Sequence, residues 1–228
     1  MSNILQAGAA AIETTPPLGS IINGDFVTHY AQKIHDPLHA KALVLKNDDT
    51  CLVIVVVDIC VMGKAFLDET KNIIEGQFGI PPIQVLISAT HTHASGAVED
   101  VHMVPADMAY RKRLPGLIAK AVGKALVGLK PAKLAFGSID VPEYVMCRRY
   151  WMKESYSPIN PVTGNTDQIK TNPFGVEDQI IKPLNTPDPE LSFMAVKGLD
   201  GQWTPYIMLG TGKTEPYQLI ILVCFPMH

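Results

Sequence analysis

The sequence predicts an α/β protein built as a layered mixed sheet flanked by helices. Two observations predict this class: short apolar runs of strand length alternate with longer segments of helical spacing, and one apolar run leads straight into two histidines, as at the carboxyl end of a strand in an α/β protein. With 228 residues, of which 47% are hydrophobic, the chain can bury a sizeable core in one domain or slightly more.

Strand-like runs occupy residues 5–12, 40–46 and 52–58. The last two are joined by Asn-Asp-Asp-Thr at 47–50, and Asn and Asp suit a hairpin turn. The run Val-Ile-Val-Val-Val at 53–57 is typical of a strand that is buried on both faces. We therefore expect the second and third runs to pair as a hairpin.

Two helices follow from apolar spacing. Residues 64–78 carry apolar side chains near helical spacing and end at Gly79. Residues 115–129 form a wide apolar stripe that Pro131 ends. A strand is predicted next, over 133–140. The first helix would then connect the hairpin to the strand that carries the histidines.

Residues 143–189 predict no regular structure. Six of the eighteen prolines fall between 158 and 189, and no helical or strand period is present. Such a stretch is either a binding loop or lid, or disordered. We favour the loop because Tyr150, Trp151 and Phe174 give it side chains to bury. Strands are expected again at 191–197 and 203–209.

Composition excludes several classes of protein. Nineteen basic against twenty-two acidic side chains, without a basic block, argue against a nucleic-acid partner. The four cysteines are scattered without a C-x-x-C pair, which predicts neither a thiolate zinc knuckle nor a disulfide framework. We recognise no signal peptide, and the longest apolar run, 219–225, is far shorter than the ~20 residues of a transmembrane segment. The default localisation is cytoplasmic.

His91 and His93 are the main candidate site residues. They follow the apolar run 85–89 at a spacing of i and i+2, which in an extended segment puts both imidazoles on one face, roughly 6–7 Å apart at Cα. Imidazole is the commonest protein ligand of zinc, and catalytic zinc usually takes three protein ligands and a water. The spacing predicts part of a metal site, with a structural or solvent-facing pair as the alternative.

Several stretches, in order, resemble the N-terminal catalytic region of the neutral/alkaline non-lysosomal ceramidase family. They are Ile-Glu-Thr-Thr-Pro-Pro-Leu-Gly at 12–19, His-Asp-Pro-Leu-His-Ala-Lys-Ala-Leu-Val-Leu at 35–45, Gly-Ile-Pro-Pro at 79–82 with Val-Leu-Ile-Ser-Ala-Thr-His-Thr-His at 85–93, Arg-Arg-Tyr-Trp-Met-Lys at 148–153 and Pro-Asp-Pro-Glu-Leu-Ser at 187–192. The resemblance extends over roughly 5–203.

The resemblance implies a zinc-dependent amidohydrolase that cleaves the N-acyl amide of ceramide or a related lipid amide. It implies that His91 binds Zn²⁺, that His93 is catalytic beside the reacting group, and that Arg148 or Arg149 holds a carbonyl oxygen or developing oxyanion. The Ala-Ser-Gly-Ala that follows His93 departs from the family pattern of Ser followed by Gly-Pro, so the substrate is less specified than the fold.

Five further residues complete the predicted site. His35 and Asp58 are expected near it; Asp58 would orient a metal-bound histidine or, alternatively, cap the helix or loop that follows. Tyr150, Trp151 and Phe174 are expected to line the approach of an apolar substrate.

The resemblance ends near residue 209. We expect residues 1–209 to form an incomplete ceramidase-like catalytic domain and 210–228 a divergent tail, as in a truncated or frame-shifted sequence, so that the fold is incomplete at its C-terminus and associates through an exposed sheet edge. The alternative is a non-catalytic remnant, a structural or binding domain of the same fold. Many family members are secreted or membrane-associated, which leaves the localisation open.

Overall fold

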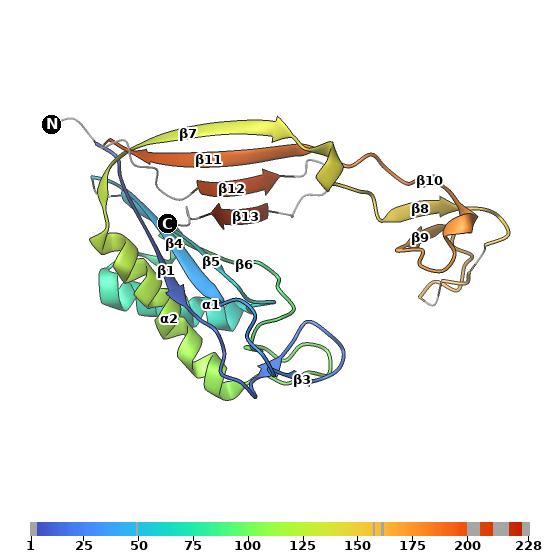
Figure 1. Ribbon diagram of the computed structural model, residues 1–228, viewed down its shortest axis with the longest axis horizontal. Coiled ribbons are helices and arrows are strands. Elements are labelled where there is room, and N and C mark those ends of the chain that lie inside the picture. Colours follow the sequence, from blue (N-terminus) through green and yellow to red (C-terminus); the bar gives the residue numbers. More distant parts are fainter. Residues whose placement is uncertain are drawn as a thin grey trace. The chain divides into compact units, whose positions relative to one another are not determined.

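A computed structural model describes residues 4–48, 50–156, 158–160 and 162–199, and the backbone of 206–211 and 219–224. It confirms the α/β class with a mixed sheet of eight strands, in the order β13-β12-β11-β7-β1-β4-β5-β6 (Figure 1). The sheet and its two helices consist of β1 Gln6–Glu13, β4 His39–Asn47, β5 Thr50–Val57, α1 Lys64–Phe78, β6 Val85–Ala89, α2 Met108–Val127, β7 Lys130–Asp140, β11 Glu190–Gly198, β12 Tyr206–Thr211 and β13 Leu219–Cys224.

The predicted hairpin is confirmed. Strands β4 and β5 pair antiparallel from Asn47↔Thr50 to Ala40↔Val57, and β1 pairs with the other side of β4. Alternate side chains of β4 face opposite sides of the sheet, and both sides are covered, because Val44 belongs to one buried cluster and Leu43 to another. Burial on both faces explains the nearly unbroken apolar runs of these strands.

Helix α1 also lies where the sequence predicts it. It ends at Gly79, whose φ of 69° is left-handed and therefore suits glycine. The helix connects β5 to β6, and these strands run parallel with Val57 opposite Ala89. Since parallel neighbours point the same way, the chain leaves β5 and β6 at the same edge of the sheet.

Helix α2 begins seven residues earlier than predicted, at Met108 and not at residue 115. The side chain of Asp107 caps it by accepting hydrogen bonds from the backbone amides of Ala109 and Tyr110. Pro115 lies inside this helix and does not start it. The next strand, β7, likewise begins at Lys130, ahead of the predicted residue 133.

The helices cover one face of the sheet. Side chains of α1 and α2, such as Phe66, Leu114 and Ile118, pack with those of β4 and β5 into the larger buried cluster, and Figure 1 shows both helices on the same side of β1, β4 and β5. A smaller cluster on the other face joins β4 to Met194 and Val196 of β11. No helix in the described part of the chain is long and apolar enough to cross a membrane.

The chain divides into two compact units, of which the second holds Gly137–Ser192. The prediction of no regular structure in this stretch is wrong, because β8 (Arg149–Met152) pairs with β9 (Ile169–Thr171) and β10 (Ile180–Pro183). Strands of three or four residues are too short to show a period in the sequence.

Short elements complete the chain. In the first unit, β2 (Ile21–Ile22) and β3 (His29–Tyr30) pair as a small ribbon, and the 3₁₀ turn η1 (Pro82–Gln84) precedes β6. The second unit holds the 3₁₀ turns η2 (Pro142–Tyr144) and η3 (Glu177–Gln179). The predicted strand at 203–209 corresponds to β12, which pairs with β11. The side chains of the predicted apolar tail, 219–225, lie outside the described residues.

Candidate metal centre

The candidate site lies where β5 and β6 end. The parallel ladder continues beyond both strands, because the amide of Thr90 donates to the carbonyl of Val57 (3.0 Å) and the amide of His91 donates to that of Ile59 (2.9 Å). These two bonds fix the segment after β6 against the segment after β5. Sites of α/β proteins are typically built at this edge of the sheet.

His91 has an unusual backbone conformation. Its φ is 62°, in the left-handed region that costs a residue with a Cβ about 1–2 kcal/mol. Strain of this kind persists where the surrounding hydrogen bonds hold it, and it concentrates at functional sites. Here the bond from the His91 amide to Ile59 supplies that constraint.

The two predicted histidines lie together. Their Nε2 atoms are 3.4 Å apart, and the rings meet edge to face, with centroids 4.9 Å apart and an interplanar angle of 78°. Both side chains are exposed. The pair therefore presents two nitrogen donors to a ligand that approaches from solvent.

Cys60 joins this pair, although sequence analysis did not select it. Its carbonyl oxygen lies 2.8 Å from Nδ1 of His91, and its Sγ lies 3.8 Å from the same nitrogen. Because a carbonyl only accepts, Nδ1 carries the proton and Nε2 of the neutral imidazole is left to bind a metal. One donor atom from each of Cys60, His91 and His93 lies within 4.8 Å of the other two.

The three donors fit a metal ion. The Nε2 atoms are 3.4 Å apart, so an ion that binds Nε2 of His91 at about 2.0–2.1 Å would lie close to the His93 ring. The carbonyl of Cys60 fixes the tautomer of His91 in the way that metal-binding histidines commonly require. The donor set is thus compatible with a metal, as the sequence predicts, and it suits Zn²⁺ chemically.

Asp58 does not orient His91 in this structure. Its carboxylate accepts a hydrogen bond from the amide of His39 (2.9 Å) and lies 3.9 Å from Nζ of Lys41. It does not cap α1 either, since Gly63 stands at that position. The carboxylate connects the first residue of β4 to the end of β5. A place for Asp58 near the site stays a prediction.

His35 contacts its neighbour. Its Nδ1 lies 2.7 Å from the Asp36 carboxylate, and both side chains are exposed. A role for His35 at the site stays a prediction.

A second loop packs on His93. A Cβ added to Gly24 would lie 2.5 Å from Cγ of His93, and Gly24 has a φ of 120°, so only glycine fits. The side-chain amide of Asn23 donates to the carbonyl of Glu99 (3.4 Å) and ties this loop to the segment that follows the histidines. Gly24 therefore positions the His93 ring.

Two ionisable groups near the pair have shifted pKa values. The backbone amide of Phe26, and then His29, lower the pKa of Asp25, and the charge of His93 adds a small further lowering. Burial raises the pKa of the Cys60 thiol, because the interior disfavours a thiolate. Without a metal, Cys60 is therefore a neutral thiol at physiological pH.

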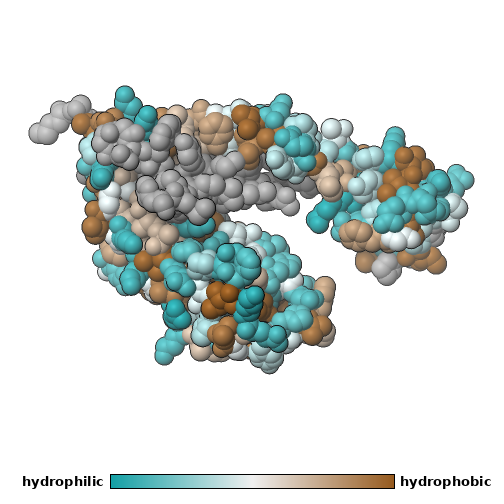
Figure 2. Space-filling model, in the orientation of Figure 1, coloured by the Kyte–Doolittle hydropathy of each residue, from teal (hydrophilic) through white to brown (hydrophobic). Residues whose placement is uncertain are grey.

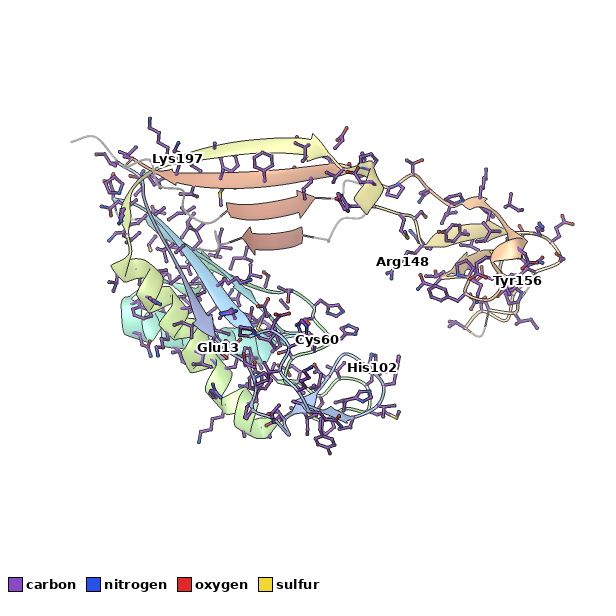
Figure 3. All side chains as sticks on the ribbon, in the orientation of Figure 1. Glu13, Cys60, His102, Arg148, Tyr156 and Lys197 are labelled. Carbon is purple, nitrogen blue, oxygen red and sulfur yellow. The ribbon has the colours of Figure 1, made fainter. Side chains whose placement is uncertain are left out.

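Apolar side chains are exposed in the loop that contains Gly24 and in the segment that follows the two histidines. Phe26 stacks on His102 with ring centroids 4.4 Å apart, and Val27 and Met103 stand beside them in the sequence; all three apolar side chains are more than half exposed. Figure 2 shows brown, hydrophobic atoms in the lower part of the molecule, where Figure 1 labels β3, and Figure 3 labels His102 there.

The remaining predicted site residues belong to the second unit. Arg148 and Arg149 are exposed, Tyr150 and Trp151 are half-buried on β8, and Phe174 is 81% exposed. Their predicted placement around the histidine pair stays a prediction.

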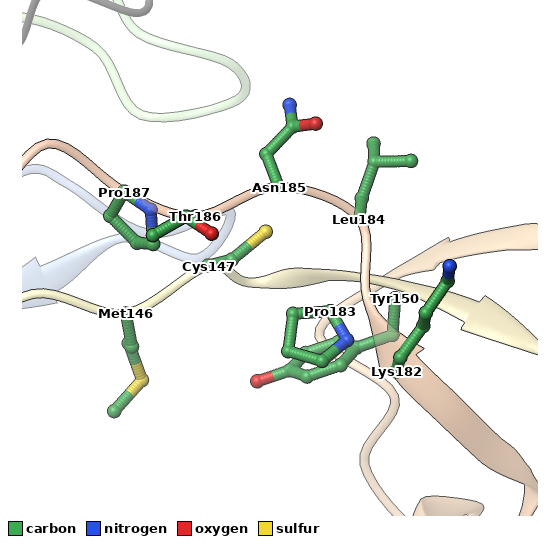
Figure 4. Close-up of a pocket in the computed structure, with 9 residues that line it drawn as sticks. All are labelled: Met146, Cys147, Tyr150, Lys182, Pro183, Leu184, Asn185, Thr186 and Pro187. Atoms are coloured by element: carbon green, nitrogen blue, oxygen red, sulfur yellow. The ribbon is translucent and has the colours of Figure 1, made fainter.

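The second unit has a cavity of its own, of about 560 Å³. Figure 4 shows its lining, which includes Tyr150, Cys147 and Lys182 but neither Trp151 nor Phe174. The backbone amide of Asn185, more than any other group, lowers the pKa of the Cys147 thiol. The pKa of the Cys147 thiol is thus lowered, whereas that of the buried Cys60 thiol is raised.

Comparison with solved structures shows a shared fold. The chain is similar to the neutral ceramidase of Pseudomonas aeruginosa, with a TM-score of 0.60 and 17% sequence identity over 89% of this chain and 31% of that chain. A ceramidase complexed with C2 matches with the same TM-score and identity, over 30% of its length. No family model and no curated protein matches the sequence. The chain therefore has a ceramidase-like fold and spans about a third of the ceramidase chains it matches.

Proposed function

We propose that this chain is part of a metal-dependent amide hydrolase of the neutral ceramidase type, acting on the N-acyl amide of ceramide or a related lipid amide. The observation that carries the proposal is the imidazole pair that follows β6, with Nε2 atoms 3.4 Å apart and a fixed tautomer at His91. The ceramidase-like fold supports the choice of reaction.

The chemistry follows from these donors. Zinc, when bound, supplies a water with a pKa lowered toward 7 and polarises a carbonyl. His91 binds the ion through Nε2, and the bond from Nδ1 to the Cys60 carbonyl keeps the ring in place. His93 stands beside the reacting group, where its Nε2 holds or moves a proton, or donates to the developing oxyanion.

The surface beside His93, where a substrate would bind, carries apolar side chains. Phe26 and Val27 follow Gly24 after Asp25, and Gly24 packs on His93, so exposed hydrophobic side chains begin two residues from a contact with the site. An apolar wall with few polar groups suits a lipid amide. We propose that Tyr150, Trp151 and Phe174 add to this wall, and that Arg148 or Arg149 binds the carbonyl oxygen.

The test combines metal analysis with cleavage. Zinc bound per chain and release of fatty acid from a short-chain fluorescent ceramide are measured for the wild type and for His91→Asn, because asparagine tolerates the left-handed backbone at this position. We expect zinc retention and cleavage to be lost in His91→Asn, whereas His93→Ala keeps most of the zinc and loses rate. Equal zinc content in wild type and His91→Asn would refute the assignment, and zinc retention without cleavage would favour the binding-domain alternative.

A further inference from the structure

Cys60 has no part in the proposed reaction, yet its position is closely specified. The amide of His91 donates to Ile59, and Nδ1 of His91 contacts the carbonyl of Cys60, so two hydrogen bonds tie the histidine to consecutive peptide units. They place Sγ of Cys60 3.8 Å from Nδ1 of His91. Among the described residues, His91 supplies the one polar contact of this sulfur.

The surroundings of Cys60 suit a ligand. Its side chain is 4% exposed, whereas both imidazoles face solvent, so the sulfur forms the inner wall of a site that is open on the other side. Catalytic zinc sites have this form, with protein donors on one side and a free position on the other, and cysteine is among their ligands. Sulfur donors also favour zinc over hard ions such as Mg²⁺.

The distances allow one ion to contact both residues. A sulfur at 2.3 Å and a nitrogen at 2.0–2.1 Å from a tetrahedral zinc are about 3.6 Å apart. In the structure Sγ lies 3.8 Å from Nδ1 of His91, so contact with an ion on Nε2, the other nitrogen of the same ring, requires a rotation of the side chains.

We propose that Cys60 is a metal ligand in this chain and that its sulfur binds the same divalent, thiophilic ion as Nε2 of His91. This inference rests on the proposed function for the ion at His91 and adds a donor that the family resemblance does not supply. On binding, the thiol releases its proton to solvent and the sulfur binds as thiolate.

Cobalt(II) is the probe for the test, because a thiolate ligand gives Co²⁺ an intense near-ultraviolet charge-transfer band that nitrogen and oxygen ligands do not. The 228-residue chain is titrated with Co²⁺ as wild type, Cys60→Ala, Cys60→Ser and Cys51→Ala. Cys51 is the matched control, since it is a half-buried cysteine on β5, the strand that leads to Cys60. We expect the band in the wild type and in Cys51→Ala, its loss in both Cys60 variants, and zinc affinity weakened by a factor on the order of 100 in these variants.

X-ray absorption on the zinc-loaded wild type supports the test without any mutation. One sulfur near 2.3 Å is expected beside nitrogen or oxygen at 2.0–2.1 Å. Zinc bound through His91 with only nitrogen and oxygen neighbours would overturn the role of Cys60 and leave the proposed function intact. A cobalt–thiolate band that persists in His91→Asn but not in Cys60→Ala would support Cys60 and overturn the ligand of the proposed function, and no metal binding by the wild type would overturn both.

Discussion

Replacing Gly24 by alanine tests whether this loop positions His93. The new Cβ would lie 2.5 Å from Cγ and 2.8 Å from Cβ and Cδ2 of His93, distances that real Cβ atoms do not show. The φ of 120° adds backbone strain of about 1–2 kcal/mol, and displacing the ring costs about 1–3 kcal/mol more. We expect a total loss of stability of about 2–5 kcal/mol, or a fall in Tm of roughly 4–20 °C.

Thermal unfolding followed by circular dichroism measures the loss of stability, and the NMR signals of the His93 ring report its displacement. Gly116→Ala is the control, because Gly116 is exposed in α2 with nothing within 4 Å of the added Cβ. That variant should gain about 0.5–1 kcal/mol, as alanine does inside a helix. If Gly24→Ala unfolds at the wild-type temperature with unchanged His93 signals, Gly24 does not hold the ring and the reasoning fails.

Three further predictions concern backbone strain and titration. His91→Gly should be more stable than His91→Ala by about 1 kcal/mol in urea unfolding, because the φ of 62° strains alanine; equal stabilities would show that the backbone relaxes. In the metal-free chain, Cys147 should be alkylated faster than Cys60, because backbone amides lower the pKa of the first thiol and burial raises that of the second; peptide mapping that finds the reverse order would contradict both environments. The Asp25 carboxylate should stabilise its loop above its ordinary pKa of 3.8 and lose this effect as pH falls through its lower folded-state value. An NMR titration of Asp25 that gives a value at or above 3.8 would refute this sign, and Asp25→Asn should remove the transition.

Local sequence patterns predict those parts of the fold that depend on nearby residues. Helix α1 and the hairpin of β4 and β5 each show a period, a turn signal and an end signal within a single stretch. The start of α2 escapes this reasoning because its first turns are capped by Asp107 before the apolar stripe begins. The first residue of α2 is set by the hydrogen bonds that the Asp107 side chain accepts, and the spacing of apolar residues cannot predict such a cap.

The candidate site also contains residues that a local pattern predicts and a residue that only the folded sheet brings in. His91 and His93 are two residues apart, which predicts that they lie close together, although the left-handed φ of His91 departs from the extended segment that the sequence analysis assumes. Cys60 is separated from His91 by 31 positions, and only the parallel pairing of β5 with β6 brings them together. The sequence did contain a signal for this proximity. Cys60 and His91 each follow a strand, and one helix joins the two strands. Two strands connected in this way run parallel as neighbours, so the residues that follow them lie at the same edge of the sheet. Asp58, which stands two positions before Cys60, is bound to the opposite neighbour of β5.

The three donors of the candidate site lie on one β-α-β segment, since Cys60 follows β5 and both histidines follow β6, with α1 between. Assembly of the donors therefore requires closure of a single crossover, and the chain length to be closed is short compared with the whole protein. A site of this kind can form as soon as that segment docks, ahead of contacts from more distant parts of the sequence. Metal ions present during synthesis would then act on folding itself, by stabilising an early supersecondary unit by a free energy that rises with the logarithm of their concentration.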